Sequence, residues 1–269
     1  IFTTSGTKQV TLTISNGSCF NTVTQNITIN DSPTADFAST APQCTGVGVS
    51  FSNIGTTSGG WTYAWSFGSG ATPSTSTLQN PSGVVYNTAG NKTIRFIITN
   101  GICSDTIYNT ITIYQTPAAG FTFANNVCGG TEVNFTNTGA TGGSWSYSWD
   151  LGSGAVPATS NAENPTGITY ATHGAKTVTQ TISSGYCSNS LTQTLTILEK
   201  PVADFASTAP QCTGLGVNFT YTGATTGIWT YAWDLGSGAT PATSTQLNPS
   251  GVVYSTAGNK TIRFIITNG

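Results

Sequence analysis

The chain has 269 residues, of which 6% are charged and 10% are aromatic, and its formal net charge at pH 7 is −2. Seven lysines and arginines supply no basic surface for nucleic acid, and no apolar run approaches the roughly 18 residues that span a membrane. Aromatic and β-branched residues are too frequent for a disordered chain, so the composition predicts folded β-structure with an uncharged polar surface.

Between residues 33 and 116 the sequence predicts short strands separated by turns. Alternating apolar and polar positions, or short β-branched runs, place strands at residues 35–39, 47–52, 61–67, 83–86, 92–99 and 106–114. Gly90 precedes the fifth of these strands, in a turn that calls for a positive φ angle. No segment has a helical period, so this stretch is predicted to be all-β.

The strand at residues 61–67 carries three large aromatic side chains, Trp61, Tyr63 and Trp65, at alternate positions. Alternation places all three on one face of the strand. We expect this face to form the core of a small β-sandwich, by analogy with the buried tryptophan of such domains. The alternative is an exposed aromatic row that stacks on sugar rings, in which Trp61 and its counterparts Trp145 and Trp229 would contact a glycan.

These elements recur with a period of 84 residues. The glycines that follow four matching segments show the period: Gly17, Gly101, Gly185 and Gly269. A period this long exceeds the 20–50 residues of solenoid units, so each repeat is predicted to fold as an independent domain. Short strands with regular turn signals in each repeat predict tandem immunoglobulin-like β-sandwiches.

Prolines at short joints mark the predicted domain boundaries, at Pro33, Pro117 and Pro201. A proline with a fixed φ angle in a joint without a Gly/Ser spacer favours a semi-rigid connection. The chain is thereby divided into residues 1–32, 33–116, 117–200 and 201–269. The first segment carries only the last two strands of a domain, and the last segment lacks its final strand. We expect the sequence to be a window on a longer array; the alternative is that copies join head to tail by strand addition and form a filament.

No constellation of catalytic residues is evident, so we expect no enzyme activity and no cofactor. The one histidine, His173, lies in a turn where the other repeats have alanine, and is expected to be a solvated surface residue. Nine carboxylates are scattered along the chain. Calcium needs several converging oxygen ligands, and no acidic loop of that kind is present, so no metal site is predicted and calcium is a minor alternative.

The six cysteines also follow the 84-residue period, as two series: Cys19, Cys103 and Cys187, and Cys44, Cys128 and Cys212. Their regular placement in a Thr- and Asn-rich chain suits an oxidising, extracellular setting. They are expected to be structural, but spacing alone does not give their connectivity.

Three disulfide patterns are compatible with the spacing. Bonds within a domain would join Cys44 to Cys103 and Cys128 to Cys187, leaving the partners of Cys19 and Cys212 outside the sequence. Bonds between sequence neighbours would be Cys19–Cys44, Cys103–Cys128 and Cys187–Cys212. A staple between adjacent domains would be, for instance, Cys44–Cys187. We favour the first pattern because it makes each domain self-contained, although the immunoglobulin strand order would place Cys44 and Cys103 at opposite poles.

In these motifs the chain resembles the polycystic kidney disease (PKD) domain family. The segments that carry the resemblance are Trp65-Ser66-Phe67-Gly68-Ser69-Gly70, Asn80-Pro81, Tyr86, Gly90 and the alternating strand at residues 93–99. The second acidic residue of the family pattern is Ser69 here, which weakens a calcium role. The resemblance implies an extracellular β-sandwich module used as a spacer or interaction domain.

Cysteine-bearing tandem copies of this kind are similar to repeats in secreted surface proteins of Bacteroidota bacteria. Asp105-Thr106-Ile107 resembles the short O-glycosylation motif of such proteins, which makes Thr106 a candidate for glycosylation. We therefore predict a structural repeat segment of a long, secreted cell-surface protein, used as a stalk, fibre or adhesin shaft. Its expected partners are neighbouring repeats, other copies of the chain and surface glycans. The alternative function is a carbohydrate-binding accessory module of a secreted hydrolase.

Overall fold

The computed structural model describes residues 1–223 and 228–268, and all of their regular structure is β, with no helix among them. Two compact units divide the chain. One comprises Ile1–Pro117 together with Ser183–Ser188, and the other comprises Ala118–Ile182 and Asn189–Gly269. Gly269, the last residue of the predicted fourth segment, lies outside the described residues. The fold is a series of tandem immunoglobulin-like β-sandwiches, as the sequence predicted.

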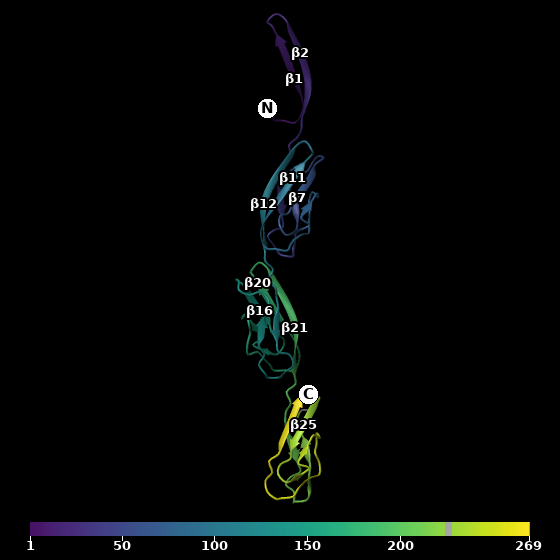
Figure 1. The fold of residues 1–269 in the computed structure, drawn as a ribbon, viewed down its shortest axis with the longest axis vertical. Helices are drawn as coiled ribbons and strands as arrows, with labels where there is room; N and C mark the ends of the chain where they lie inside the picture. The colour runs from purple at the N-terminus through teal and green to yellow at the C-terminus, as the bar shows by residue number, and fades with distance from the viewer. Residues whose placement is uncertain (224–227, 269) are drawn as a thin grey trace. The chain divides into compact units, whose positions relative to one another are not determined.

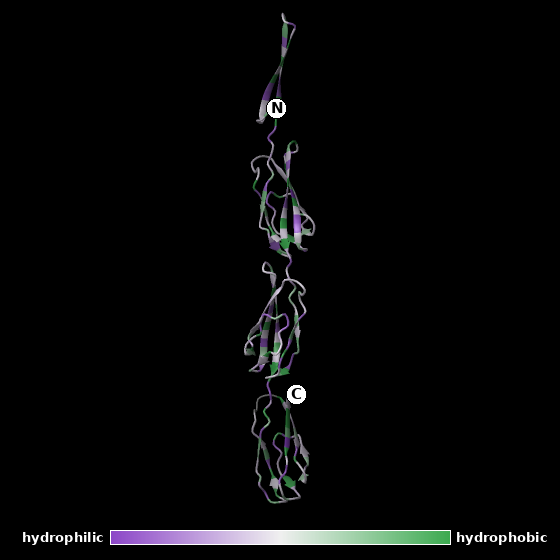
Figure 2. Ribbon diagram, turned by 90° about the vertical axis from the view of Figure 1, so that its left-hand side faces the viewer, coloured by the Kyte–Doolittle hydropathy of each residue, from purple (hydrophilic) through white to green (hydrophobic). Residues whose placement is uncertain are grey.

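The chain begins with a hairpin of β1 (Gly6–Ser15) and β2 (Phe20–Ile29), which pair antiparallel over their full length. Apolar residues recur along both strands (Figure 2). Val10, Leu12 and Ile14 correspond to Ile94, Phe96 and Ile98 of the next repeat, which are core residues, yet all three are exposed on the hairpin.

The first complete sandwich has a five-stranded sheet in the order β4-β12-β11-β7-β9, a three-stranded sheet β5-β10-β8 and the pair β3-β6. Its strands are β3 (Phe37–Ser39), β4 (Gln43–Cys44), β5 (Gly48–Val49), β6 (Phe51–Asn53), β7 (Thr62–Ser66), β8 (Ala71–Thr72), β9 (Thr75–Ser76), β10 (Val84–Tyr86), β11 (Gly90–Thr99) and β12 (Ser104–Tyr114). β11 lies between β12 and the aromatic strand β7 (Figure 1). The predicted strands are all present, with ends shifted by at most two residues except where 47–52 divides into β5 and β6.

The second sandwich repeats this arrangement, with sheets β14-β21-β20-β16-β18, β17-β19 and β13-β15. Its strands are β13 (Phe121–Phe123), β14 (Val127–Cys128), β15 (Phe135–Asn137), β16 (Ser146–Asp150), β17 (Ala155–Val156), β18 (Thr159–Ser160), β19 (Thr169–Tyr170), β20 (Gly174–Ser183) and β21 (Ser188–Leu198). Gly90 and Gly174 begin the long strands β11 and β20 with φ angles of 103° and 100°. Both angles lie in the region where a side chain would be strained, which confirms the predicted turn.

The third sandwich has sheets β27-β25-β29, β23-β28-β26 and β22-β24. Its strands are β22 (Phe205–Ser207), β23 (Gly216–Val217), β24 (Phe219–Tyr221), β25 (Trp229–Asp234), β26 (Ala239–Thr240), β27 (Thr243–Ser244), β28 (Val252–Tyr254) and β29 (Arg263–Asn268). No strand equivalent to β12 or β21 follows β29 among the described residues.

Each sandwich has its own hydrophobic core. The three clusters of buried side chains run from Ala35 to Ile113, from Phe121 to Ile197 and from Val217 to Val252 within the described part of the chain. Each cluster falls inside one of the predicted segments 33–116, 117–200 and 201–269. The exact boundaries at Pro33, Pro117 and Pro201 stay a prediction.

Candidate functional site: the clasp at Cys44 and Cys187

The aromatic strands belong to the cores. In β7 the side chain of Trp65 is 2% exposed, and Trp61 and Tyr63 pack against the same buried cluster. Trp61 donates a hydrogen bond from Nε1 to the backbone oxygen of Ser58 at 2.8 Å. Trp145 is likewise half-buried and Trp229 is buried. The three tryptophans proposed as a glycan contact therefore do not form an exposed aromatic row.

Two hydrogen bonds fix the core aromatics in each repeat with the same spacing. Trp65 Nε1 donates to the backbone oxygen of Leu78 at 2.8 Å, and its counterparts Trp149 and Trp233 make the same bond 84 and 168 residues further on. Tyr86 donates its hydroxyl to the backbone oxygen of Phe67 at 2.8 Å. The polar atoms of these large side chains are thereby satisfied inside the cores.

Burial changes the acidity of the core tyrosines. Tyr86 has no exposed surface, and loss of water contact raises its pKa to about 12. The pKa of Tyr170 is also raised to about 12, first by burial and then by the negative charge of Asp150. Burial raises the pKa of Tyr254 as well. All three are neutral hydrogen-bond donors at physiological pH.

One pole of the first sandwich is built where β4 meets the end of β12. The two strands are parallel, with Gln43 opposite Ile113 and Cys44 opposite Tyr114. Thr45 then donates its backbone N–H to the oxygen of Tyr114 at 2.8 Å. Thr116, which starts the joint to the next repeat, makes two further hydrogen bonds to Thr45. These bonds hold Cys44 and Tyr114 side by side; we call this pair, with its backbone, the pole.

The tip of the β20–β21 hairpin, Ser183–Ser188, belongs to the same compact unit as this pole. Cys187 forms a disulfide with Cys44, with a Cα–Cα distance of 5.9 Å. The ring of Tyr186 stacks on that of Tyr114, with centroids 4.1 Å apart and an interplanar angle of 8°. Burial, followed by the neighbouring Tyr186 hydroxyl, raises the pKa of Tyr114. We call the disulfide and the stacked rings together the clasp.

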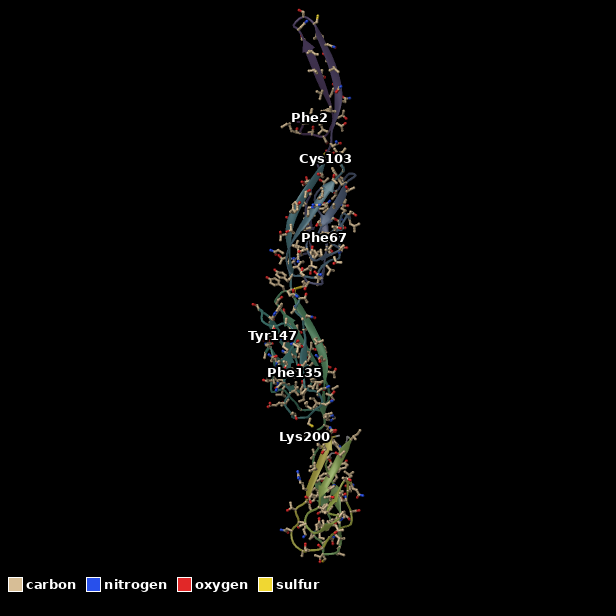
Figure 3. The ribbon with its side chains drawn as sticks, in the orientation of Figure 1. Phe2, Phe67, Cys103, Phe135, Tyr147 and Lys200 are labelled. Atoms are coloured by element: carbon tan, nitrogen blue, oxygen red, sulfur yellow. A yellow bond between two sulfur atoms is a disulfide. The ribbon has the colours of Figure 1, made fainter. Side chains whose placement is uncertain are left out.

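The predicted pairing of Cys44 with Cys103, and of Cys128 with Cys187, is wrong. Cys44 lies beside the last residue of β12. Cys103 precedes the first residue of β12, at the hairpin tip (Figure 3). Eleven strand residues at about 3.3 Å each separate the two cysteines by roughly 35 Å, far beyond disulfide reach. The structure contains the pattern that staples adjacent repeats, and Cys19, Cys103, Cys128 and Cys212 are free.

The remaining candidate residues are not brought together. Thr106 is exposed on β12, next to Asp105, whose carboxylate accepts a hydrogen bond from the backbone N–H of Ala35 at 2.8 Å. Glycosylation of Thr106 stays a prediction. His173 is exposed in the turn before β20.

Within residues 1–223 and 228–268, no three His, Cys, Asp or Glu side chains gather as metal ligands, and calcium binding is untested. The same residues include no helix long and apolar enough to span a membrane.

Comparisons with known proteins found one family model and several solved structures to which parts of the chain are similar. The family model of the PKD domain matches residues 114–198, which covers the second complete repeat. Among solved structures, the I-band fragment I67–I69 of titin is 14% identical, covers 89% of this chain and 95% of its own, and has a TM-score of 0.45. The three N-terminal domains of the outer capsid protein Hoc of bacteriophage RB49 are 13% identical, with coverages of 82% and 80% and a TM-score of 0.33. No curated protein sequence matches the chain significantly.

Proposed function

We propose that this segment is a structural repeat region of a long, secreted bacterial surface protein, and that it carries tension as part of a stalk, fibre or adhesin shaft. The observation that supports this most strongly is the clasp. It joins the pole of one repeat covalently to the hairpin tip of the next. A catalytic or ligand-binding module would need no such bond.

The position of the disulfide determines how the chain responds to a pull. Cys44 and Cys187 are separated by 143 residues in sequence, and this stretch includes most of the first two sandwiches. A pull on both ends of the chain passes through the sulfur–sulfur bond, so the residues between the cysteines cannot be extended while it is intact. If the first two sandwiches open, only the residues outside the loop can be extended while the disulfide is intact.

The same bond supports an extracellular location. Disulfides persist in oxidising compartments and are reduced in the cytosol of most cells. The scarcity of charge and the abundance of Thr, Asn and Gly are compatible with an exposed surface structure. The resemblance of the cysteine-bearing repeats to those of Bacteroidota surface proteins supports a bacterial source.

Antibodies raised against this segment and applied to intact cells of the source organism test the location and the role together. We expect labelling without permeabilisation, and electron microscopy of the labelled material should show the antibody on extended structures. Labelling that appears only after the cells are permeabilised, or antibody bound only to isolated globules, would contradict the proposal.

A further inference from the structure

The stacked tyrosines of the clasp have no tyrosine counterparts in the other repeats. The residues at the equivalent positions are Asn30 and Leu198 for Tyr114, and Ser18 and Ile102 for Tyr186. The repeat fold therefore does not require a tyrosine at either position. The pair is specific to the joint that the disulfide closes.

The two rings of the clasp are held face to face. Their centroids are 4.1 Å apart, and their planes differ by 8°. Cys44 lies opposite Tyr114, and Cys187 directly follows Tyr186, so the disulfide holds the backbone on both sides of the stack. The Tyr186 hydroxyl is also a neighbour of the Tyr114 hydroxyl. Parallel rings with neighbouring hydroxyls bring the carbons ortho to those hydroxyls face to face.

An oxidant in solution can reach this pair. The side chain of Tyr186 is 72% exposed, and Tyr114 is half-buried. The core tyrosines Tyr86 and Tyr170, in contrast, are shielded from solvent. The chain contains no methionine, so no thioether competes with these phenols for the oxidant.

The tyrosines elsewhere in the described residues lack this geometry. Tyr221 and Tyr231 also touch, but their centroids are 6.1 Å apart and their planes differ by 55°. The Tyr221 hydroxyl is donated to the backbone oxygen of Val202 at 3.1 Å, inside the third sandwich. Tyr108 is exposed on β12 and stacks on no other described ring. Within residues 1–223 and 228–268, two tyrosine rings lie parallel to each other only in the clasp.

We propose that Tyr114 and Tyr186 form an oxidative cross-linking site, at which a haem peroxidase acting with hydrogen peroxide joins the two rings by a carbon–carbon bond. The bond connects the carbons ortho to the hydroxyls. The disulfide acts first, because it brings the two phenols together and makes their reaction intramolecular. This inference rests on the geometry of the clasp and goes beyond the proposed function, which does not require it.

The reaction removes two electrons and two protons from the pair. Each phenol loses one electron and one proton and becomes a phenoxyl radical, whose unpaired electron is shared with the ortho carbons. The two radicals combine at these carbons. The ring hydrogen at each end of the new bond then moves to the oxygen, so both hydroxyls are restored. The electrons and protons that were removed reduce one molecule of hydrogen peroxide to two molecules of water.

The cross-link gives the joint a second bond, which thiols do not cleave. A thiolate opens a disulfide by attacking a sulfur atom, and a carbon–carbon bond offers no such atom. Tyr114 and Tyr186 both lie between Cys44 and Cys187 in the sequence, so the new loop lies inside the loop that the disulfide closes. The second sandwich therefore stays enclosed by a covalent loop after the disulfide is reduced.

Oxidation of the intact 269-residue chain tests the proposal. The free cysteines are first alkylated with the disulfide intact, and the chain is then treated with a haem peroxidase and limiting hydrogen peroxide. After reduction and proteolysis, mass spectrometry measures every tyrosine–tyrosine cross-link. We expect the Tyr114–Tyr186 link to be on the order of ten-fold more abundant than any other, because its rings are held together. Its yield per chain should not change when the protein is diluted.

Two phenylalanine variants provide matched controls. Tyr186→Phe keeps a ring in the stack but removes the phenol, and it should abolish the link while the Cys44–Cys187 disulfide still forms. Tyr108→Phe removes an exposed phenol that has no stacked partner, and it should leave the link unchanged. Equal cross-linking among the exposed tyrosines, a yield that falls on dilution, or oxidation of Tyr108 without a Tyr114–Tyr186 link would each overturn the proposal. These results would leave the cell-surface labelling experiment, and with it the proposed function, unaffected.

Discussion

At the scale of single residues, the second repeat places a polar side chain at a core position where both neighbouring repeats have phenylalanine. Phe96 stacks on Trp65 with ring centroids 4.0 Å apart, and Phe264 stacks on Trp233 at the same distance. The counterpart in the second repeat is Gln180, which has no exposed surface. A polar amide thus replaces an aromatic stack that contributes about 0.5–1.5 kcal/mol beyond its buried area.

Gln180 is accommodated because both ends of its amide form hydrogen bonds. Its Oε1 accepts a hydrogen bond from the backbone N–H of Gly120 at 2.9 Å, and its Nε2 donates to Oδ1 of Asn137 at 2.8 Å. A buried amide with both ends bonded costs little, whereas a buried donor left without an acceptor is expensive.

Gln180→Leu should therefore destabilise the second sandwich although leucine is the more apolar residue. The substitution leaves the Gly120 N–H without its acceptor, at a cost of about 1–3 kcal/mol. Hydrogen exchange followed by mass spectrometry should show faster exchange in β20 and β21 and unchanged exchange in β11. Gln9→Leu, at an exposed position of β1, is the matched control and should change exchange little.

The raised pKa values of the core tyrosines predict alkaline unfolding. Tyr86 and Tyr170 have pKa values of about 12 when folded and near 10 when unfolded. Between these values the unfolded chain has lost the proton that the folded chain keeps, so stability is full below pH 10 and falls as the pH rises toward 12. Urea unfolding between pH 9 and 12, with free cysteines alkylated, measures the effect.

The double variant Tyr86→Phe and Tyr170→Phe should lose about 1 kcal/mol per hydrogen bond at neutral pH and show a shallower decline above pH 10. Tyr108→Phe, at an exposed site on β12, should decline as the unmodified chain does. An equally steep decline in the double variant would show that other groups cause the alkaline unfolding.

At the scale of elements, the aromatic strands form the centre of each core. Trp65 packs against Phe37 and Phe96 and is almost wholly buried, while Trp61 at the end of the same face is only partly covered. The stabilising contribution along this face should therefore rise from Trp61 to Trp65.

Trp65→Ala should destabilise the first sandwich by about 3–5 kcal/mol, because it empties a large buried volume. Trp61→Ala should cost less than half as much, since that ring is already part-exposed. Hydrogen exchange of β11 gives both values.

A glycan array with the unmodified chain and Trp61→Ala then addresses the alternative function. Glycan binding that disappears in Trp61→Ala while β11 stays protected would favour the carbohydrate-binding role.

The sequence was sufficient to predict the strands that carry an alternating pattern. The long strand β11 and the aromatic strand β7 show such a pattern over five or more residues, and both were placed within two residues of their ends. The two-residue strand β4, Gln43–Cys44, was not predicted, because two residues contain no period. β4 exists only because the end of β12 lies beside it.

The disulfide could not be derived from spacing for the same reason. All three patterns satisfy an 84-residue period, and loop entropy differs little among them. The decisive fact is that β4 brings Cys44 to the end of β12, opposite the end at which Cys103 lies. The immunoglobulin strand order predicts this separation, because it places Cys44 and Cys103 at opposite poles of the sandwich. A distance of this size excludes a disulfide between them, whereas the self-contained domain that such a bond would give favours it only weakly.

At the scale of the whole chain, the clasp closes a loop of 143 residues. In the chain-entropy model a loop of this length stabilises the folded state by about 5 kcal/mol, and the stacked Tyr114 and Tyr186 rings add about 1 kcal/mol.

Self-association into a filament stays a prediction. The exposed apolar residues of the β1–β2 hairpin would favour self-association, because a second copy of the chain could bury them. Sedimentation of the purified chain as a function of concentration would detect such self-association.

Single-molecule extension of the chain from its two ends is the most direct test of a tension-carrying role. With the clasp intact, the residues between Cys44 and Cys187 should stay hidden from the pulling force. At about 3.5 Å per residue, the fully unfolded chain should then be shorter by about 500 Å than after reduction with a small thiol. Cys44→Ser should give the reduced length under both conditions. Equal lengths of the unmodified chain before and after reduction would contradict the account.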